Sequence, residues 1–144
     1  MEIQAILAAK GTGVMTTRPG ARIGTVVRKM RIEKVGAPVV GDDGERVQGL
    51  ISERDIVHGL AEHGAALPGL EVADPMARGG PTRTRRDNIR KVMVAMTQRR
   101  VRHLPVVEGG RLGGIIGIGE VIKNRLEAVE RESNVPRDAD LATR

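Results

Sequence analysis

The chain has 144 residues, 40% of them apolar, and a formal net charge of +6, so it is long enough for one compact domain or two small halves that share a core. Phe, Tyr, Trp and Cys are all absent, which excludes disulfides and thiolate metal sites and predicts a core of aliphatic side chains and methionine. The longest apolar stretch, 112–119, is too short to span a bilayer, and the N-terminal residues lack the basic segment of a secretory signal. We therefore expect a cytoplasmic protein with no membrane attachment.

Two stretches of the chain carry the same pattern. Residues 15–40 align with residues 81–106 at a constant offset of 66, and after the next loop the offset becomes 65. The second offset aligns "GLISERDI" (49–56) with "GIIGIGEV" (114–121). A repeat of this length with a single one-residue slip indicates a duplicated unit.

Each copy predicts the element order β-α-β-β-α. A short extended piece ends at Thr16 or Thr82, and apolar residues then recur at helical spacings of three and four over 23–30 and 89–96. An apolar strand, a Gly- and Asp-containing hairpin loop and a second strand follow, and the second strand runs into a second helix. Before the first copy, residues 2–9 predict a short amphipathic helix.

The predicted units are a first repeat at 8–64, a linker at 65–80, a second repeat at 81–126 and a C-terminal helix end with a flexible tail at 127–144. Gly64 is a suitable helix end, and two prolines prevent a long helix in the linker. One repeat alone leaves a sheet face uncovered, so we expect the two repeats to pack together in an α/β (α+β) fold.

The junction of the second strand and second helix places Ser52 at a predicted N-cap and Asp55 three residues later. A serine and an acid at this spacing form a capping box, which stabilises a helix start without any ligand. The same geometry offers N–H groups and a hydroxyl to a phosphate, and a carboxylate to a ribose diol. Both interpretations stay open. Gly117 and Glu120 take these places in the second copy, where we expect a site that is weakened, altered or empty.

Patterns for common catalytic and metal sites are missing. The chain has no GxxxxGK[ST] motif, and the GxGxx stretches at 11–16 and 117–122 lack the third glycine of a dinucleotide fingerprint. The three histidines lack metal-ligand spacing, and Ser52 and Asp55 are too close on one helical turn for a Ser-His-Asp triad. We predict no catalytic residues, no metal and no required cofactor.

The repeat and the motif at 49–55 resemble cystathionine-β-synthase (CBS) domains, whose junction reads Gly, two apolar residues, Ser or Thr, any residue, a small polar or basic residue, then Asp. Two such domains over 8–126 resemble the CBS pair, or Bateman module, of small stand-alone bacterial proteins. The resemblance implies pseudo-twofold packing of the two β-α-β-β-α repeats, two clefts, and an adenosine ligand such as AMP, ATP or NAD.

The resemblance also implies roles for individual residues. Asp55 is expected at the ribose hydroxyls and Ser52 near the ribose or phosphate. The remaining expected positions are Thr16 and Thr82 at the repeat starts, Val35, Gly36 and Ala37 at the adenine, Arg54, Arg102 and His103 at the phosphates, and Glu120 in the second cleft. His103 also has an alternative interpretation as a strand-edge residue with no ligand role.

We therefore predict a regulatory module that is not an enzyme, senses an adenosine nucleotide, and acts through an unknown protein target or through its own homodimer. Nucleic-acid binding is one alternative, because residues 78–102 contain nine basic residues and only one acidic residue. No aromatic residue that could stack on a base accompanies them. A ligand-free structural dimeric adaptor is the other, in which Ser52 and Asp55 serve only the helix cap.

Overall fold

The computed structural model describes the backbone of residues 1–10 and 13–143 and, within these ranges, the side chains as far as Glu132. It has the mixed helix-and-strand fold that the repeat pattern predicts. The first half contains α1 (Ile3–Lys10), β1 (Thr16–Thr17), α2 (Ile23–Glu33), β2 (Val39–Val40), β3 (Gly49–Leu50), α3 (Glu53–His63) and the 3₁₀ helix η1 (Gly64–Gly69). The second half contains β4 (Ala77–Arg78), α4 (Ile89–Arg99), β5 (His103–Glu108), β6 (Arg111–Gly117) and α5 (Ile118–Thr143).

The duplication seen in the sequence is present in the backbone. The helices α2 and α4 are both 11 residues long and begin 66 residues apart. Each is followed by a residue in the left-handed conformation, Lys34 or Arg100, with a φ of 56° and an N–H that donates to a carbonyl of the last turn. This ending satisfies a helix carbonyl and redirects the chain toward the next strand. The offset then becomes 65, because α3 begins at Glu53 and α5 at Ile118.

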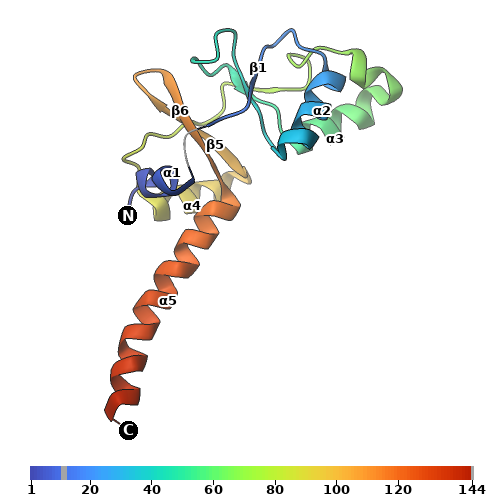
Figure 1. Ribbon diagram of the computed structural model, residues 1–144. Helices are drawn as coiled ribbons and strands as arrows, with labels where there is room; N and C mark the ends of the chain where they lie inside the picture. Colours follow the sequence, from blue (N-terminus) through green and yellow to red (C-terminus); the bar gives the residue numbers. More distant parts are fainter. Residues whose placement is uncertain (11–12, 144) are drawn as a thin grey trace.

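Two small sheets lie at the centre of the molecule (Figure 1). One has the strand order β1-β2-β3-β4, with β1 and β2 parallel and the other pairs antiparallel. The other is the antiparallel β5-β6 hairpin, whose register shifts between Val106 and Val107. A single parallel bridge joins Arg83 to Val106 of this hairpin. It occupies the place that the parallel pairing of β1 with β2 has in the first copy. The predicted β-α-β-β-α order therefore holds, with a shorter first strand in the second copy.

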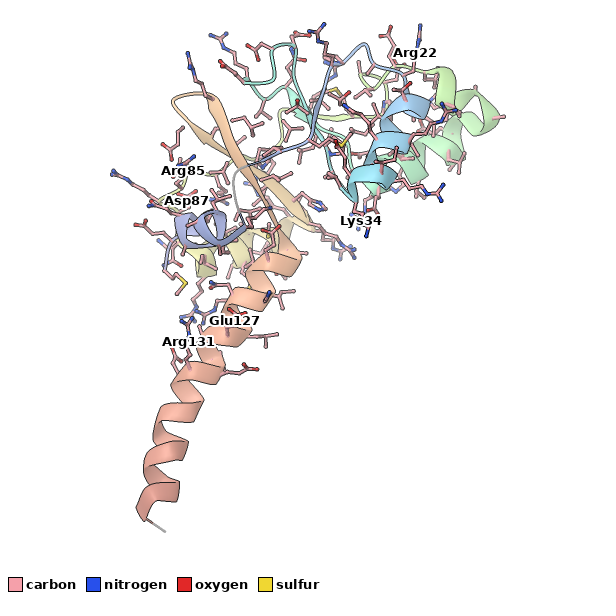
Figure 2. The ribbon with its side chains drawn as sticks, in the orientation of Figure 1. Arg22, Lys34, Arg85, Asp87, Glu127 and Arg131 are labelled. Atoms are coloured by element: carbon pink, nitrogen blue, oxygen red, sulfur yellow. The ribbon has the colours of Figure 1, made fainter. Side chains whose placement is uncertain are left out.

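The core of the second repeat is completed by α1. Its apolar side chains, on Ile3, Ile6 and Leu7, form one buried cluster with residues of α4, β5, β6 and α5. The backbone N–H groups of Ile3 and Gln4 donate to the carbonyls of Asp87 and Arg85 at 2.9 Å each. Figure 2 places Arg85 and Asp87 beside α1. The helix expected at 2–9 is present, and it packs on the second repeat.

The core of the first repeat is completed by the stretch expected to be a linker, 65–80. Its buried side chains are Leu67, Val72 and Met76, which cluster with residues of α2, β2 and the strand-to-helix junction. This stretch also supplies β4, which pairs with β3. The structure thus gives these residues a different role from the predicted one. The reason is that the sheet and helices of one repeat leave apolar surface that needs a cover.

The C-terminal segment also differs from the prediction. α5 continues to Thr143 and projects away from both sheets (Figure 1), where the sequence predicts a helix end and flexible tail at 127–144. The part of this stretch that precedes Pro136 contains no glycine and three glutamates, which favour helix.

The contribution of α1 can be tested with Ile3→Ala. Ile3 has no exposed surface, so the substitution leaves a cavity in the second core and should lower the free energy of unfolding by about 2–5 kcal/mol. Urea denaturation measures this loss, with Gln4→Ala as the control at an exposed position of the same helix. Equal losses in the two variants would contradict a core role for α1.

Candidate functional site

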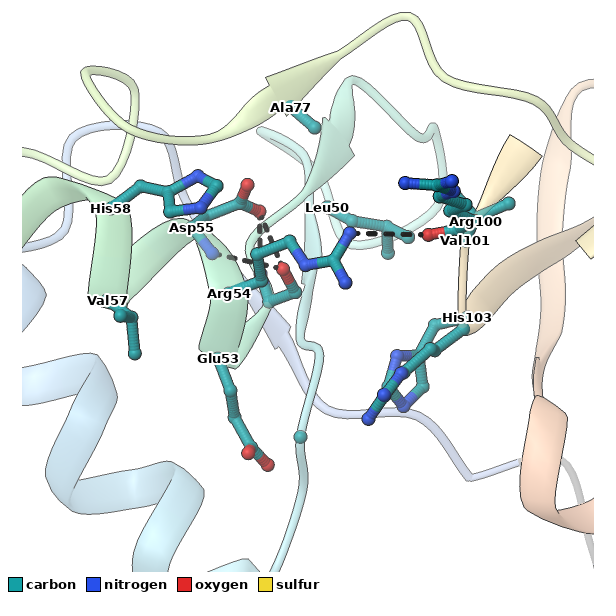
Figure 3. Close-up of a pocket in the computed structure, with 13 residues that line it drawn as sticks. Leu50, Glu53, Arg54, Asp55, Val57, His58, Ala77, Arg100, Val101 and His103 are labelled. Atoms are coloured by element: carbon teal, nitrogen blue, oxygen red, sulfur yellow. Dashed lines mark hydrogen bonds between the residues drawn. The ribbon is translucent and has the colours of Figure 1, made fainter. Parts of the chain in front are cut away.

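A cavity of about 590 Å³ lies where the two repeats meet. One wall is the start of α3 with β3, β4 and Gly36, and the opposite wall is the chain that leads from α4 into β5 (Figure 3). The lining residues are Gly36, Leu50, Ser52, Glu53, Arg54, Asp55, Val57, His58, Ala77, Arg100, Val101, Arg102 and His103. The cavity therefore requires both repeats, since neither supplies more than one wall.

Ser52 and Asp55 form a capping box at the start of α3. The Asp55 N–H donates to Ser52 Oγ at 3.2 Å, and Asp55 Oδ2 accepts from the Ser52 N–H at 2.9 Å and from Ser52 Oγ at 3.0 Å. The interpretation of Ser52 and Asp55 as a helix capping box is thus correct. Because both accepted hydrogen bonds end on Oδ2, the carboxylate keeps Oδ1 for another donor. The cap and a ligand site are therefore compatible.

Three arginines surround the cavity, and two of them face each other across it. Arg54 comes from α3, whereas Arg100 and Arg102 come from the segment between α4 and β5. The Arg54 guanidinium crosses the cavity and donates from Nη1 to the Arg100 carbonyl at 3.5 Å (Figure 3). At this length the hydrogen bond is weak. The cross-repeat contact can therefore be exchanged for a better acceptor.

His103 is half-buried at the start of β5 and lines both this cavity and a smaller one of about 150 Å³ beside it. Burial of the ring lowers the pKa of His103 below the ordinary 6.5, and Lys10 and Arg102 act in the same direction. The carboxylates of Glu53 and Glu120 oppose this shift in pKa. His103 is consequently held neutral near pH 7 and stands between acids from both junctions.

The second junction occupies the corresponding place in the repeat but has different side-chain contacts. Gly117 stands where the first copy has Ser52, so the hydroxyl is missing. Glu120 Oε1 forms an ion pair with Lys10 Nζ at 2.9 Å, and the same ammonium donates to the Ile115 carbonyl at 2.8 Å. Lys10 belongs to α1, so a cation from another element already neutralises the carboxylate that corresponds to Asp55.

Six of the eleven expected site residues line the larger cavity: Gly36, Ser52, Arg54, Asp55, Arg102 and His103. Thr82 lines the smaller cavity together with His103. The other four line neither cavity. Ala37 is buried, Val35 is half-buried just after α2, Thr16 is paired in β1, and Glu120 is engaged by Lys10.

Seven lining residues are absent from the expected set: Leu50, Glu53, Val57, His58, Ala77, Arg100 and Val101. Helical spacing could have indicated His58, which follows Arg54 by one turn on α3. Ala77 and Arg100 carry no comparable signal, because β4 pairing and the turn after α4 bring them to the cavity.

The part of the chain that the structure describes contains no group of His, Asp and Glu side chains arranged to hold a metal ion. Within the same residues, no helix is both long and apolar enough to cross a bilayer.

The lowered pKa of His103 makes stability depend on pH. The unfolded chain binds a proton near pH 6.5 and the folded chain at lower pH, so stability should fall as pH drops through this window and be fully regained above it. In urea denaturation at about pH 5 and about pH 7.5, His103→Gln should lose less stability on acidification than the parent. His63→Gln, at the exposed end of α3, is the control. Identical pH profiles for His103→Gln and the parent would contradict this assignment.

Comparison with known proteins gives consistent matches. The family model of the CBS domain matches residues 11–62 and 84–127. The "CBS domain-containing protein CBSX3, mitochondrial" of Arabidopsis thaliana is 32% identical over 101 residues, which cover 67% of this chain and 49% of that protein, so this chain spans about half its length.

Solved structures match over most of the chain. The CBS-domain containing protein ATU1752 from Agrobacterium tumefaciens has a TM-score of 0.82 and 37% identity, with 86% of this chain and 92% of that chain covered. The CBS domain pair of MJ0100 has a TM-score of 0.76 at 18% identity, with 90% and 98% covered, and shares the fold. The two matched regions coincide with the two copies of the repeat, and the chain belongs to the CBS domain family as a tandem pair of CBS domains.

Proposed function

We propose that this CBS pair is a regulatory module that binds an adenosine nucleotide in the larger cavity and modulates a partner protein or its own assembly. The observation that carries the proposal is the meeting of Asp55 with Arg54, Arg102 and His103 from opposite walls of one cavity. A carboxylate, several cations and an apolar wall are the groups that a ribose, a phosphate and a base require.

The chemistry of the cavity supports each part of such a ligand. Its volume lies in the range usual for small-molecule sites, roughly 300–1,000 Å³. Leu50, Ala77 and Val101 offer apolar surface to a base, and Asp55 Oδ1 is available to a ribose diol. The guanidinium groups opposite supply the positive charge that a phosphate needs.

A related solved structure supports the adenosine part of the proposal. The CBS domain pair of MJ0100 was crystallised with 5′-methylthioadenosine and S-adenosyl-L-methionine, both of which contain adenosine. AMP, ATP and NAD contain it too, and Asp55 addresses that shared ribose. The cytoplasmic location and the regulated partner stay predictions.

Binding without catalysis fits the contacts of Ser52. Its hydroxyl donates to Asp55 Oδ2, and that carboxylate oxygen also accepts from the Ser52 backbone. A serine nucleophile needs a base that takes its proton, and a carboxylate engaged in a helix cap is a poor one. CBS pairs are generally regulatory, and we extend this to the present chain.

Exposed apolar side chains support a homodimer. Val57 on α3 and Ile122 on α5 are 63% and 45% exposed and occupy matching places in the two repeats, 65 residues apart. Leu60, Leu126 and Val129 extend the same type of surface along these helices. Surface of this kind commonly becomes an interface between identical chains.

Nucleic-acid binding is less well supported, because the basic run at 78–102 is not one free surface. Arg83 and Arg85 are half-buried beside the β5-β6 hairpin, and Arg85 Nη2 donates to the Gly113 carbonyl at 3.5 Å. Arg100 and Arg102 line the cavity.

The proposal predicts that Asp55→Ala weakens binding of AMP or ATP by about 10- to 100-fold, the usual worth of hydrogen bonds to a charged group. Because the chain has no Phe, Tyr or Trp, adenine absorbance reports directly on bound nucleotide in equilibrium dialysis. The control is Asp87→Ala, at a residue that does not line the cavity. Asp87 accepts hydrogen bonds from the Thr84 N–H at 3.0 Å and from the Thr84 hydroxyl at 3.2 Å, so the substitution removes a hydroxyl–carboxylate pair like that of Ser52 and Asp55.

Three results would separate the candidate functions. Equal affinities in Asp55→Ala and Asp87→Ala would contradict the ribose role of Asp55. Binding of no adenosine nucleotide at all would favour the ligand-free adaptor. Duplex DNA binding with a steep dependence on salt would favour the nucleic-acid alternative.

The Lys10–Glu120 ion pair predicts one nucleotide per chain rather than two. Glu120→Ala should therefore leave nucleotide affinity within about threefold of the parent, although Glu120 corresponds to Asp55 in the repeat. Isothermal titration calorimetry gives both the affinity and the stoichiometry. A stoichiometry of two that falls to one in Glu120→Ala would mean that the second cleft binds nucleotide.

A further inference from the structure

The His103 ring lies between one glycine of the first repeat and one glycine of the second. A Cβ added to Gly36 would lie 3.7 Å from His103 Cε1, and a Cβ added to Gly117 would lie 3.7 Å from His103 Cδ2. The two glycines therefore leave room for the ring, one at each of its edges. Figure 3 shows His103 on the wall of the cavity opposite the start of α3.

Each of these glycines also lies beside a carboxylate. The Cβ position on Gly36 is 2.8 Å from Glu53 Oε1, and the Cβ position on Gly117 is 3.2 Å from Glu120 Oε1. Glu53 belongs to the first turn of α3, and Glu120 belongs to the first turn of α5. One acid from each repeat thus flanks the His103 ring.

The Glu120 carboxylate lacks one hydrogen-bond donor. Its Oε1 accepts from Lys10 Nζ at 2.9 Å, whereas its Oε2 is buried and has no partner among the residues that the structure describes. A buried oxygen without a donor is unfavourable. A neutral imidazole offers a single N–H, and an imidazolium offers two. Protonation of His103 therefore supplies one N–H for each of the two flanking acids.

We propose that His103 is a proton-operated bridge between the two repeats, in which the imidazolium donates one N–H to Glu53 of α3 and the other to Glu120 of α5. The neutral ring cannot donate to both acids, so the bridge forms as the pH falls and opens as the pH rises. It adds charge-assisted hydrogen bonds across a cavity that Arg54 and the Arg100 carbonyl span at 3.5 Å. The inference goes beyond the proposed function, because a proton operates the bridge and no nucleotide is required.

The surroundings of His103 set the pH at which the bridge forms. Burial of the ring is the main influence and lowers its pKa below 6.5. Glu53 and Glu120 raise the pKa, whereas Lys10 of α1 and Arg102, the preceding residue, lower it. The bridge is therefore expected to form below neutral pH. The other charged or titratable residues that line the larger cavity with His103 are Arg54, Asp55, His58 and Arg100.

The test is a proton NMR titration of the three histidines from about pH 8 to about pH 4.5. Because the chain has no Phe, Tyr or Trp, the imidazole C–H signals are its only aromatic ones, and single His→Gln variants assign them. Glu53→Ala and Glu120→Ala should each lower the pKa of His103 further, because each removes one negative charge that favours the imidazolium. Lys10→Met should raise this pKa, because it removes a positive charge.

A second NMR measurement distinguishes a bridge from a nearby charge. Imidazolium N–H protons that are hydrogen-bonded to a carboxylate exchange slowly with water, so they can be observed in ¹⁵N-labelled protein. At the acidic end of the titration, the parent should show both N–H protons of His103. Glu53→Ala and Glu120→Ala should each lose one of the two signals.

The matched control is Glu62→Ala. Glu62 Oε2 lies 3.6 Å from His63 Nε2 at the exposed end of α3, so the variant removes a similar charge beside a different histidine. It should leave the pKa and the N–H signals of His103 unchanged. An unchanged His103 pKa in Glu53→Ala or in Glu120→Ala would overturn the proposal, because the bridge needs an acid from each repeat. So would a Glu62→Ala effect of equal size, or the lack of slowly exchanging N–H protons in the parent.

Discussion

The structure depends on the need to cover apolar surface that one repeat cannot cover by itself. In both copies the cover comes from the chain segment that lies outside the repeat: α1 on the second copy and the 65–80 stretch on the first. The two arrangements correspond in detail, since short bridges join Glu2 to Asn88 and Arg22 to Glu71 beside the first turns of α4 and α2. Burial of these segments ties the two repeats into one molecule.

This packing also creates the cavity. Because β4 from the 65–80 stretch pairs with β3, Ala77 lies next to Leu50 in one wall of the site. The left-handed residue after α4 turns the chain so that Arg100 to His103 face the start of α3. A ligand held between these walls contacts both repeats, so its binding energy can alter how the repeats are held together. We propose that this connection is the physical basis for regulation by this module.

The two junctions show how corresponding positions of a repeat can make different side-chain contacts. The first uses a serine and an aspartate that stabilise the helix start and leave one carboxylate oxygen available. The second has a glycine and a glutamate, and the longer side chain reaches Lys10 of α1. The change from Asp to Glu therefore moves the carboxylate from its own helix cap to a contact with a distant element. The two junctions of the repeat therefore differ in their side-chain contacts.

The sequence by itself determined the duplication, the order of elements and the chemistry of the first junction. These features are local, because helical periodicity, capping and turn residues act over a few positions. It also indicated Arg102 and His103, through a resemblance that carries position-by-position information. Only the tertiary structure decided that the 65–80 stretch belongs to a core, that Lys10 neutralises Glu120, and that Arg54 and Arg100 meet across the cavity. Each of these depends on contacts between residues far apart in the chain, for which spacing along the sequence gives no signal.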